Sequence, residues 1–191
     1  DVFYITSPFE GRSPLYQREW FAHTKVVATV YDIIPYLMKE HYLANASAYQ
    51  FYMKRIEMLR WVDRCLVISN SVKNDLLEHL QFEPDKIDVI YGAADECYCN
   101  IVVSENEKDA LFQRYAIESS YIMCTGGDDE RKNLEGLILA YALLPEQLID
   151  QYQLVIVCKL TESSFNRYTK LIEKKRLTGR VILTNFIPNE D

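Results

Sequence analysis

The sequence predicts an α/β fold built from doubly wound parallel sheets, and three observations carry that prediction. Short apolar runs alternate with amphipathic stretches along the whole chain. The apolar runs are continuous in Val, Ile and Leu, as expected of parallel strands that are covered on both faces. The alternation breaks once, between about Gly92 and Glu105, so we expect two α/β units joined there.

The expected elements follow from these patterns in chain order. Strands are predicted at residues 2–6, 25–31, 64–69, 88–91, 121–125, 153–158 and 180–184. Apolar stripes at helical spacing predict helices over about residues 45–61, 71–80, 105–116, 134–144 and 162–175. Ser71 is the expected N-cap of the second helix, and Pro145 ends the fourth.

Length and composition exclude several classes of protein. The chain has 191 residues, of which 49% are hydrophobic and 26% charged, so it can bury a sizeable core. A formal net charge of −7 argues against nucleic acid as the main partner. The longest apolar run, residues 137–144, is far too short to cross a bilayer.

The five cysteines favour a reducing cytoplasm. An odd number in a chain of this size does not indicate a disulfide framework. Cys97 and Cys99 are separated by one residue and have no matching pair elsewhere, so they lack the spacing of a zinc site. We therefore expect a cytoplasmic protein without a bound metal.

The most informative segment is residues 125–137. An apolar strand leads into Gly126 and Gly127, and a polar loop, the basic pair Arg131 and Lys132, and an amphipathic helix follow. Glycines let a backbone approach a phosphate closely, and a helix start offers unpaired N–H groups and a positive dipole end. The segment matches neither the P-loop nor the Gly-x-Gly-x-x-Gly pattern. Two interpretations stay open: an anion site, or a solvated basic pair whose charge the preceding acidic residues offset.

Other polar residues also follow predicted strands, where ligands of open α/β sheets bind. Ser69 and Ser71 are more readily interpreted as helix caps than as ligands. Asp32 precedes a turn that contains proline and suits a turn former and a polar ligand equally well. The histidines form no catalytic set with one another; they are His23, His41 and His79.

A set of motifs occurs in a characteristic order. It comprises Ser7-Pro-Phe-Glu10, Tyr31-Asp-Ile-Ile-Pro35, Val67-Ile-Ser-Asn-Ser71, Val89-Ile-Tyr-Gly-Ala-Ala-Asp95 and Thr125-Gly-Gly-x-x-x-Arg-Lys-Asn133. Each motif is weak alone, but the ordered set resembles the group 1 glycosyltransferases (family 4) over essentially the whole chain. That family has the GT-B fold, with two Rossmann-like domains, and retains the anomeric configuration of the sugar.

The resemblance also implies a domain division. Residues 1–95 would be the C-terminal half of the N-terminal, acceptor-side domain, and residues 96–191 the N-terminal half of the donor-side domain. Both domains would then be incomplete. The paired glutamates typical of the family would lie beyond Asp191, which, with a start at Asp1, predicts a fragment cut at both ends.

Several site residues are implied by the same resemblance. Lys132 matches the lysine that contacts the donor diphosphate, with Gly126 and Gly127 as the loop of close approach and Asn133 beside them. Many members carry an arginine directly after the first loop glycine. Gly127 takes that place here, so only Arg131 could substitute for it.

The sugar and the base have implied contacts as well. Asp32 matches the acidic residue of a His-Asp or His-Glu turn that faces the sugar, and Tyr31 takes the histidine position, so the resemblance implies that these two are the catalytic residues. A tyrosine hydroxyl can bind a sugar hydroxyl but carries no positive charge. Phe186 and Ile187 fall where the family's backbone meets the nucleotide base.

The expected function is therefore retaining transfer of a hexose, mannose-like or similar, from a nucleotide-diphosphate sugar to a glycan, polysaccharide or lipid-linked acceptor. The nucleotide sugar is a co-substrate, and no cofactor is expected. The isolated fragment is expected to be inactive. The main alternative is a non-catalytic GT-B-like scaffold or binding subunit, motivated by Tyr31 and the missing loop arginine. A nicotinamide-dependent dehydrogenase is disfavoured because no glycine-rich fingerprint follows a strand.

A peripheral contact with the inner face of the membrane is a further expectation. It rests on three basic residues of the helix over 45–61, namely Lys54, Arg55 and Arg60. A solvated helix face explains the same residues.

Overall fold

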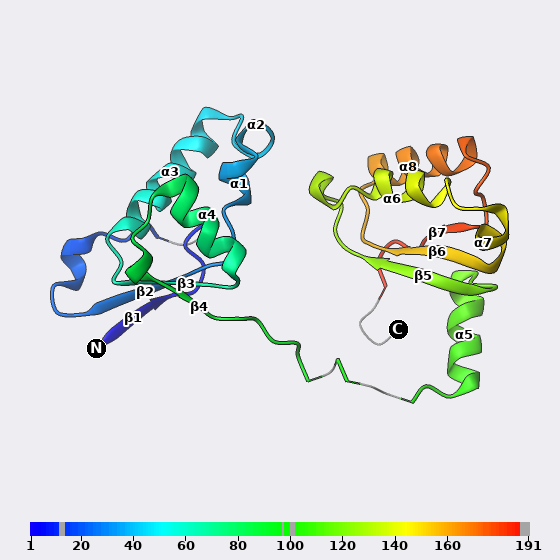
Figure 1. Ribbon diagram of the computed structural model, residues 1–191, viewed down its shortest axis with the longest axis horizontal. Coiled ribbons are helices and arrows are strands. Elements are labelled where there is room, and N and C mark those ends of the chain that lie inside the picture. The colour runs from blue at the N-terminus through cyan, green and yellow to red at the C-terminus, as the bar shows by residue number, and fades with distance from the viewer. Residues whose placement is uncertain (12–13, 97, 100–101, 188–191) are drawn as a thin grey trace. The chain divides into compact units, whose positions relative to one another are not determined.

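The computed structural model describes residues 1–11, 14–96, 98–99 and 102–187. The chain forms two compact units, residues 1–99 and residues 100–191. Each unit contains one parallel sheet with helices packed on it (Figure 1). The α/β fold with parallel sheets that the sequence predicts is confirmed.

The first unit holds a four-stranded sheet in the order β1-β2-β3-β4, with all neighbouring strands parallel. Its strands are β1 (Val2–Ile5), β2 (Lys25–Val30), β3 (Arg64–Val67) and β4 (Ile87–Val89). Its helices are η1 (Arg18–Phe21), α1 (Ile34–Leu37), α2 (Lys39–Tyr42), α3 (Ala46–Arg60), α4 (Asn70–Leu80) and η2 (Pro84–Lys86). The long helices α3 and α4 cover the same face of the sheet (Figure 1).

Helix α3 provides much of the core of this unit. The side chain of Asn45 caps it by accepting hydrogen bonds from the N–H groups of Ser47 (2.8 Å) and Ala48 (3.3 Å). Ile56 and Leu59 point from α3 into the core and are fully buried. The predicted stripe on this helix is thus buried at Tyr52, Ile56 and Leu59, whereas its first member, Tyr49, is exposed.

The second unit holds a three-stranded sheet in the order β5-β6-β7, again parallel. Its strands are β5 (Ser120–Thr125), β6 (Tyr152–Val157) and β7 (Val181–Leu183). Its helices are α5 (Glu105–Tyr115), η3 (Glu130–Lys132), α6 (Leu134–Tyr141), α7 (Glu146–Gln151) and α8 (Glu162–Lys174). Helices α6 and α8 lie on one face of this sheet and α5 on the other (Figure 1).

Gln153, at the amino end of β6, ties together the loops at that edge of the sheet. Its side chain is buried, with only 1% of the residue exposed. The carboxamide oxygen accepts from the N–H groups of Glu118 (2.7 Å) and Ser119 (3.2 Å). The carboxamide nitrogen donates to the carbonyls of Ala116 (3.3 Å) and Gly179 (2.9 Å). A single side chain therefore satisfies four backbone groups.

Several predicted details are wrong, although the strand bounds agree to within a residue or two. The N-cap of α4 is Ser69, whose hydroxyl accepts from the N–H of Val72 at 3.3 Å, and not Ser71. Ser69 follows β3 closely in an extended conformation, so Ser71 already lies in the first helical turn. The prediction also missed α7, which begins directly after Pro145, and the short helices α1 and α2.

Candidate functional site

The carboxyl edge of the second sheet gathers the loops that follow its three strands. Gly126 follows β5, and its N–H donates to the carbonyl of Val157 at the end of β6 (3.3 Å). Asn185 follows β7, and its side chain accepts from the N–H of Leu160 after β6 (3.1 Å). This edge is where an open α/β sheet offers a ligand site.

The two glycines of the loop after β5 are not required by the protein's own packing. Neither has a positive φ angle. A Cβ atom built on Gly126 would come no closer than 4.0 Å to Cγ of Lys132, and one on Gly127 would meet nothing within 4 Å. The backbone at these two positions therefore has open space above it, which a bound molecule can use.

Lys132 and Arg131 lie side by side in η3 but differ in their partners. The Arg131 guanidinium pairs with the carboxylate of Asp129 (Nε–Oδ2 3.3 Å), which also accepts from the Arg131 backbone N–H (3.0 Å). Lys132 is exposed, and its ammonium has no ion-pair partner within the described part of the chain. The loop thus compensates one of its two positive charges and leaves the other available for an anion.

Asn133 ends this loop and begins α6. It adopts a left-handed conformation (φ 49°), and its side-chain oxygen accepts from the N–H of Gly136 at 3.1 Å. A Cβ atom on Gly136 would lie 2.4 Å from the Asn133 amide nitrogen, so this glycine allows the cap to form. The capping hydrogen bond is the role that the structure gives to the Asn133 side chain.

Asp128 was missed as a site residue in the sequence, and it joins the loop to the start of α8. Its carboxylate accepts from the backbone N–H (2.9 Å) and the hydroxyl (2.7 Å) of Thr161. Thr161 in turn caps α8 through the N–H of Ser164 (3.3 Å). The Thr161 backbone hydrogen bond is the main cause that holds the pKa of Asp128 below its usual range. No local sequence signal marks this contact, because the partners are far apart in the chain.

Phe186 and Ile187 follow β7 near the same edge. Phe186 is exposed, with 67% of its surface accessible, and Ile187 is half-buried. An exposed aromatic ring at a sheet edge offers a stacking surface. The structure therefore places both residues at the edge that carries the glycine loop.

At the carboxyl edge of the first sheet, Tyr31 and Asp32 line a small pocket. Asp32 is half-buried, and its Oδ1 accepts from the N–H of Ile34 (3.0 Å), which holds the turn into α1. Tyr31 is 54% exposed. The pocket has a volume of about 120 Å³, and its lining residues are Ser7, Pro8, Phe9, Tyr31, Asp32, Pro35 and Tyr52.

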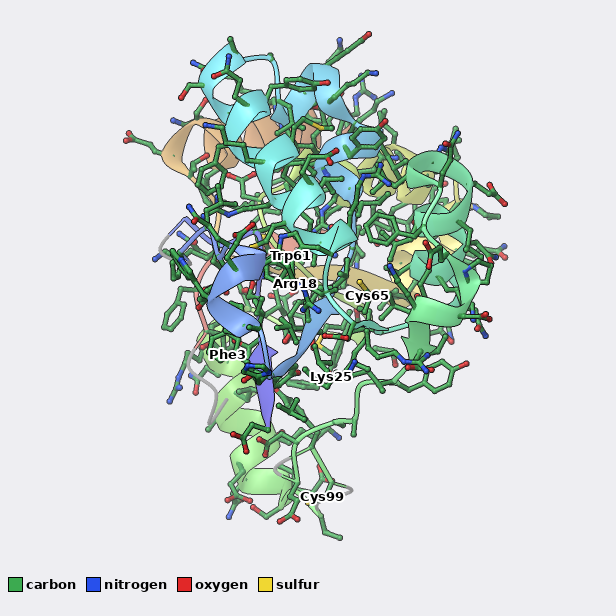
Figure 2. The ribbon with its side chains drawn as sticks, turned by 90° about the vertical axis from the view of Figure 1, so that its left-hand side faces the viewer. Phe3, Arg18, Lys25, Trp61, Cys65 and Cys99 are labelled. Carbon is green, nitrogen blue, oxygen red and sulfur yellow. The ribbon has the colours of Figure 1, made fainter. Side chains whose placement is uncertain are left out.

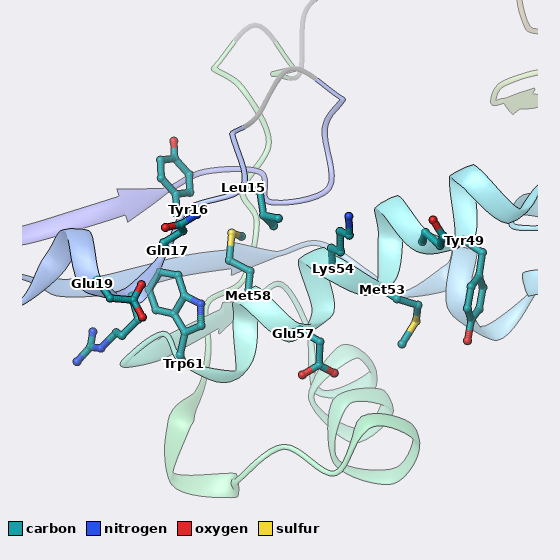
Figure 3. Close-up of a pocket in the computed structure, with 12 residues that line it drawn as sticks. Leu15, Tyr16, Gln17, Glu19, Tyr49, Met53, Lys54, Glu57, Met58 and Trp61 are labelled. Carbon is teal, nitrogen blue, oxygen red and sulfur yellow. The ribbon is translucent and has the colours of Figure 1, made fainter.

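A second pocket, of about 630 Å³, runs along α3 and is lined by apolar and aromatic side chains together with polar and charged ones. Met58 and Trp61 of α3 form part of it, together with Tyr16 from the segment before η1 (Figure 3). The guanidinium of Arg18 lies 6.0 Å from the centre of the Trp61 ring, and both are marked in Figure 2. Lys54 also lines this pocket.

The expected basic face of α3 is only partly present. Arg55 is buried, and its guanidinium lies 3.6 Å from the centre of the Phe51 ring. Arg60 donates to the carbonyl of Leu80 (3.1 Å) and pairs with Glu57 (3.3 Å). The prediction that Arg55 lies on an exposed helix face is therefore wrong.

The cysteines, the arrangement of possible metal ligands and the lengths of the helices also bear on the predictions from the sequence. The described cysteines Cys65, Cys99, Cys124 and Cys158 are free thiols, and Cys97 lies outside the described residues. Within the ranges that the structure describes, no group of three or more His, Cys, Asp or Glu is arranged to hold a metal ion. Among those same residues, no helix is long and apolar enough to cross a membrane.

Comparison with known proteins decides the family. Residues 1–97 match the family described as Glycosyltransferase Family 4, and residues 107–191 match Glycosyl transferases group 1. The chain belongs to the group 1 glycosyltransferases. The resemblance predicted from the ordered motifs is confirmed.

Curated relatives include the serotype-specific mannosyltransferase WbdA of Escherichia coli. One such protein is 30% identical over 195 residues, a match that covers 100% of this chain and 24% of the relative. The chain thus spans about a quarter of the length of the curated relatives it matches.

Solved structures agree with the GT-B-like fold. HepE of Anabaena, solved in complex with UDP-glucose, matches with a TM-score of 0.65 at 17% identity, over 86% of this chain and 43% of HepE. A glycosyltransferase from Rickettsia africae matches with a TM-score of 0.63 at 20% identity, over 99% of this chain and 47% of that protein. The predicted fold class is therefore confirmed.

Proposed function

We propose that the full-length protein is a retaining glycosyltransferase that moves a hexose from a nucleotide-diphosphate sugar to a glycan or polysaccharide acceptor. The observation that carries this proposal is the loop after β5. In a chain of this family, Lys132 has no ion-pair partner among the described residues and lies beside two glycines that leave the backbone open. Mannose is the favoured hexose because the curated relatives are mannosyltransferases.

The chemistry assigned to this loop is stabilisation of the leaving group. As the bond between the anomeric carbon and the diphosphate breaks, negative charge grows on the diphosphate oxygens. Lys132 supplies a positive charge there, and those backbone N–H groups of the loop that do not already donate within the chain supply hydrogen bonds. Arg131 is assigned a smaller part, since Asp129 already holds its guanidinium.

The remaining site residues are assigned to the sugar and the base. Asp32 and Tyr31 bind hydroxyls of the sugar at the edge of the first sheet, through the carboxylate and the phenol. Phe186 and Ile187 lie against the nucleotide base. HepE, solved with UDP-glucose, supports a nucleotide sugar as the ligand.

The two units have separate parts in this proposal. Residues 1–95 serve the acceptor side, and residues 96–191 bind the donor. The proposed location is the cytoplasm, which the free thiols support. Contact with the membrane surface, if the acceptor is lipid-linked, uses Lys54 rather than the buried Arg55.

The proposed reaction needs no metal ion, because Lys132 provides the positive charge at the diphosphate. Treatment of the full-length enzyme with EDTA should leave the rate of transfer unchanged. A loss of activity that added Mg²⁺ or Mn²⁺ restores would contradict this part of the proposal.

The function is tested by offering the full-length protein UDP-, GDP-, ADP- and dTDP-hexoses with a mannoside acceptor. The expected result is transfer from at least one donor, with a product whose anomeric configuration equals that of the donor by NMR. No turnover with any donor, or an inverted product, would contradict the proposal.

A non-catalytic GT-B-like subunit is the second candidate, favoured by Tyr31 at the histidine position and by the pairing of Arg131. Such a subunit would bind a nucleotide sugar or a glycan without turning it over. Binding of a donor by calorimetry, in the absence of transfer to any acceptor, would favour this candidate.

A further inference from the structure

The small pocket of the first unit is lined by a tyrosine, Tyr52, whose hydroxyl makes no hydrogen bond with any described residue. Tyr52 extends from α3 into its lining, and only 5% of the residue is exposed. Its ring stacks on Phe9 with a centroid distance of 4.5 Å and an interplanar angle of 14°. The ring is thereby fixed by packing, and its position does not depend on its hydroxyl.

The Tyr52 hydroxyl is buried and has no hydrogen-bond partner among the described residues. Buried tyrosine hydroxyls usually find a partner, because leaving one without a hydrogen bond destabilises the folded state. A phenylalanine would fill the same space without that cost. The presence of tyrosine here is thus unexplained by the fold.

Asp32 supplies the second polar group of the pocket. The N–H of Ile34 occupies its Oδ1, while Oδ2 keeps its capacity to accept hydrogen bonds. Burial, followed by the nearby charge of Asp32, raises the pKa of Tyr52 well above its ordinary value. Tyr52 is therefore a neutral phenol at physiological pH, able to donate or accept a hydrogen bond.

We propose that Tyr52 and Asp32 together bind one hydroxyl group of a sugar substrate, and that Tyr52 determines specificity for that hydroxyl. The sugar hydroxyl donates to Oδ2 of Asp32 and pairs with the Tyr52 hydroxyl. Pro8, Phe9 and Pro35 form apolar walls around it. The inference rests on the proposed function, to which it adds a specificity residue.

The chemistry of the pocket excludes other kinds of ligand group. A phosphate or carboxylate would be repelled by Asp32, so the pocket does not serve the diphosphate. A volume of about 120 Å³ takes a small substituent such as a hydroxyl or hydroxymethyl group. The group belongs either to the transferred hexose or to the acceptor glycan, since both offer the same hydroxyl chemistry.

Deoxy sugars test the proposal with the full-length enzyme. Wild-type protein and Tyr52→Phe are compared using donors and acceptors that each lack one hydroxyl. In the wild type, one deoxy position should lower kcat/KM about 10- to 100-fold, because it leaves the buried pair without a partner. Tyr52→Phe should lower kcat/KM for the natural substrates by a similar factor and be insensitive to that one deoxy substitution. If the sensitive position is on the donor, the pocket holds the transferred hexose, and if on the acceptor, it holds the glycan.

A control variant and a stability measurement separate this role from a structural one. Tyr49→Phe changes an exposed tyrosine of the same helix and should leave all these rates unchanged. Tyr52→Phe should have a Tm equal to or above that of the wild type, since the hydroxyl it removes has no hydrogen-bond partner in the described part of the chain. Equal loss of rate with every analogue, or a lower Tm for Tyr52→Phe, would overturn the proposal.

Absence of sugar transfer by the wild-type enzyme would contradict the proposed function. In that case a binding measurement tests the Tyr52 pocket separately. Methyl α-D-mannopyranoside and its four monodeoxy forms are then titrated and followed by saturation-transfer NMR. Wild-type binding that one deoxy form and Tyr52→Phe both abolish supports the pocket. Absence of binding, or equal binding by Tyr52→Phe, overturns it.

Discussion

The two ends of the β5-β6-β7 sheet differ in whether their polar groups are bound within the chain or available to a ligand. At the amino end, the buried carboxamide of Gln153 satisfies four backbone groups and makes that edge complete in itself. At the carboxyl end, Lys132 is exposed without an ion pair in the described chain, and Gly126 and Gly127 leave open space above the backbone. The hydrogen bonds of Gln153 therefore stabilise the amino end, whereas the carboxyl end retains binding capacity for a ligand.

The largest expected effect comes from breaking the amino end. Gln153→Leu would leave two N–H groups and two carbonyls without partners, which should destabilise the protein by about 3 kcal/mol. Urea unfolding followed by far-UV circular dichroism measures this change. Gln151→Leu, at an exposed position of α7, is the matched control and should be neutral. A loss below about 0.5 kcal/mol for Gln153→Leu would show that the amino end is not held by this side chain.

At the carboxyl end, by contrast, a substitution should lower activity and leave stability unchanged. Lys132→Ala should lower kcat/KM of the full-length enzyme for the nucleotide sugar about 100-fold, with no loss of stability. Arg131→Ala should have a smaller effect, because Asp129 already compensates its charge. Lys174→Ala, in the last turn of α8, is the control for removal of a positive charge. Equal effects of the three variants on kcat/KM would remove the distinction between Lys132 and its neighbours.

Alanine substitutions at Gly127 and Gly136 should distinguish the part of this loop in donor binding from its part in stability. Gly127→Ala adds a methyl group where no described residue lies within 4 Å, so stability should change little while donor affinity falls roughly tenfold. Gly136→Ala would bring its methyl group against the Asn133 cap and should cost about 1 kcal/mol of stability. Calorimetry with the donor and thermal unfolding measure the two effects. Unchanged donor affinity in Gly127→Ala would argue against a phosphate above this loop.

The smallest expected effect is the pH dependence of the stability that Asp128 provides. The pKa of Asp128 is lower in the folded chain than the unfolded value of about 3.9. Its contribution to stability, about 1 kcal/mol, is therefore complete above that value and is lost as pH falls through the folded pKa. Asp128→Asn should be less stable than the wild type at pH 7, and the difference should shrink below about pH 4. A difference that stays constant from pH 7 to pH 3 would contradict this sign.

The local features of the fold were predictable from the sequence, and the long-range contacts were not. Continuous apolar runs predicted each parallel strand, although β5 is largely exposed and is not buried on both faces as such strands usually are. Ser69 and Ser71 are equally good caps by residue type, and only the exact end of β3 decides between them. The hydrogen bonds of Gln153 and Asp128 join residues that are far apart in the chain, so no periodicity reveals them.

The candidate site likewise contains residues that the sequence could identify and one that it could not. Gly126, Gly127 and Lys132 were identifiable because they form one contiguous motif whose residue types suit an anion. Tyr52 was visible only as part of an apolar helical stripe. The stripe predicts that its ring is buried, but it does not show that its hydroxyl lacks a hydrogen-bond partner among the residues that the structure describes.

The central claim is that the carboxyl edge of the second sheet binds a nucleotide diphosphate. The most direct test is to add GDP and UDP to ¹⁵N-labelled full-length protein and to follow the backbone amide resonances by NMR. The account predicts that at least one nucleotide shifts the amides of residues 126–133, and that Gln153 at the opposite edge shifts little. Binding of either nucleotide that leaves the amides of 126–133 unmoved would contradict it.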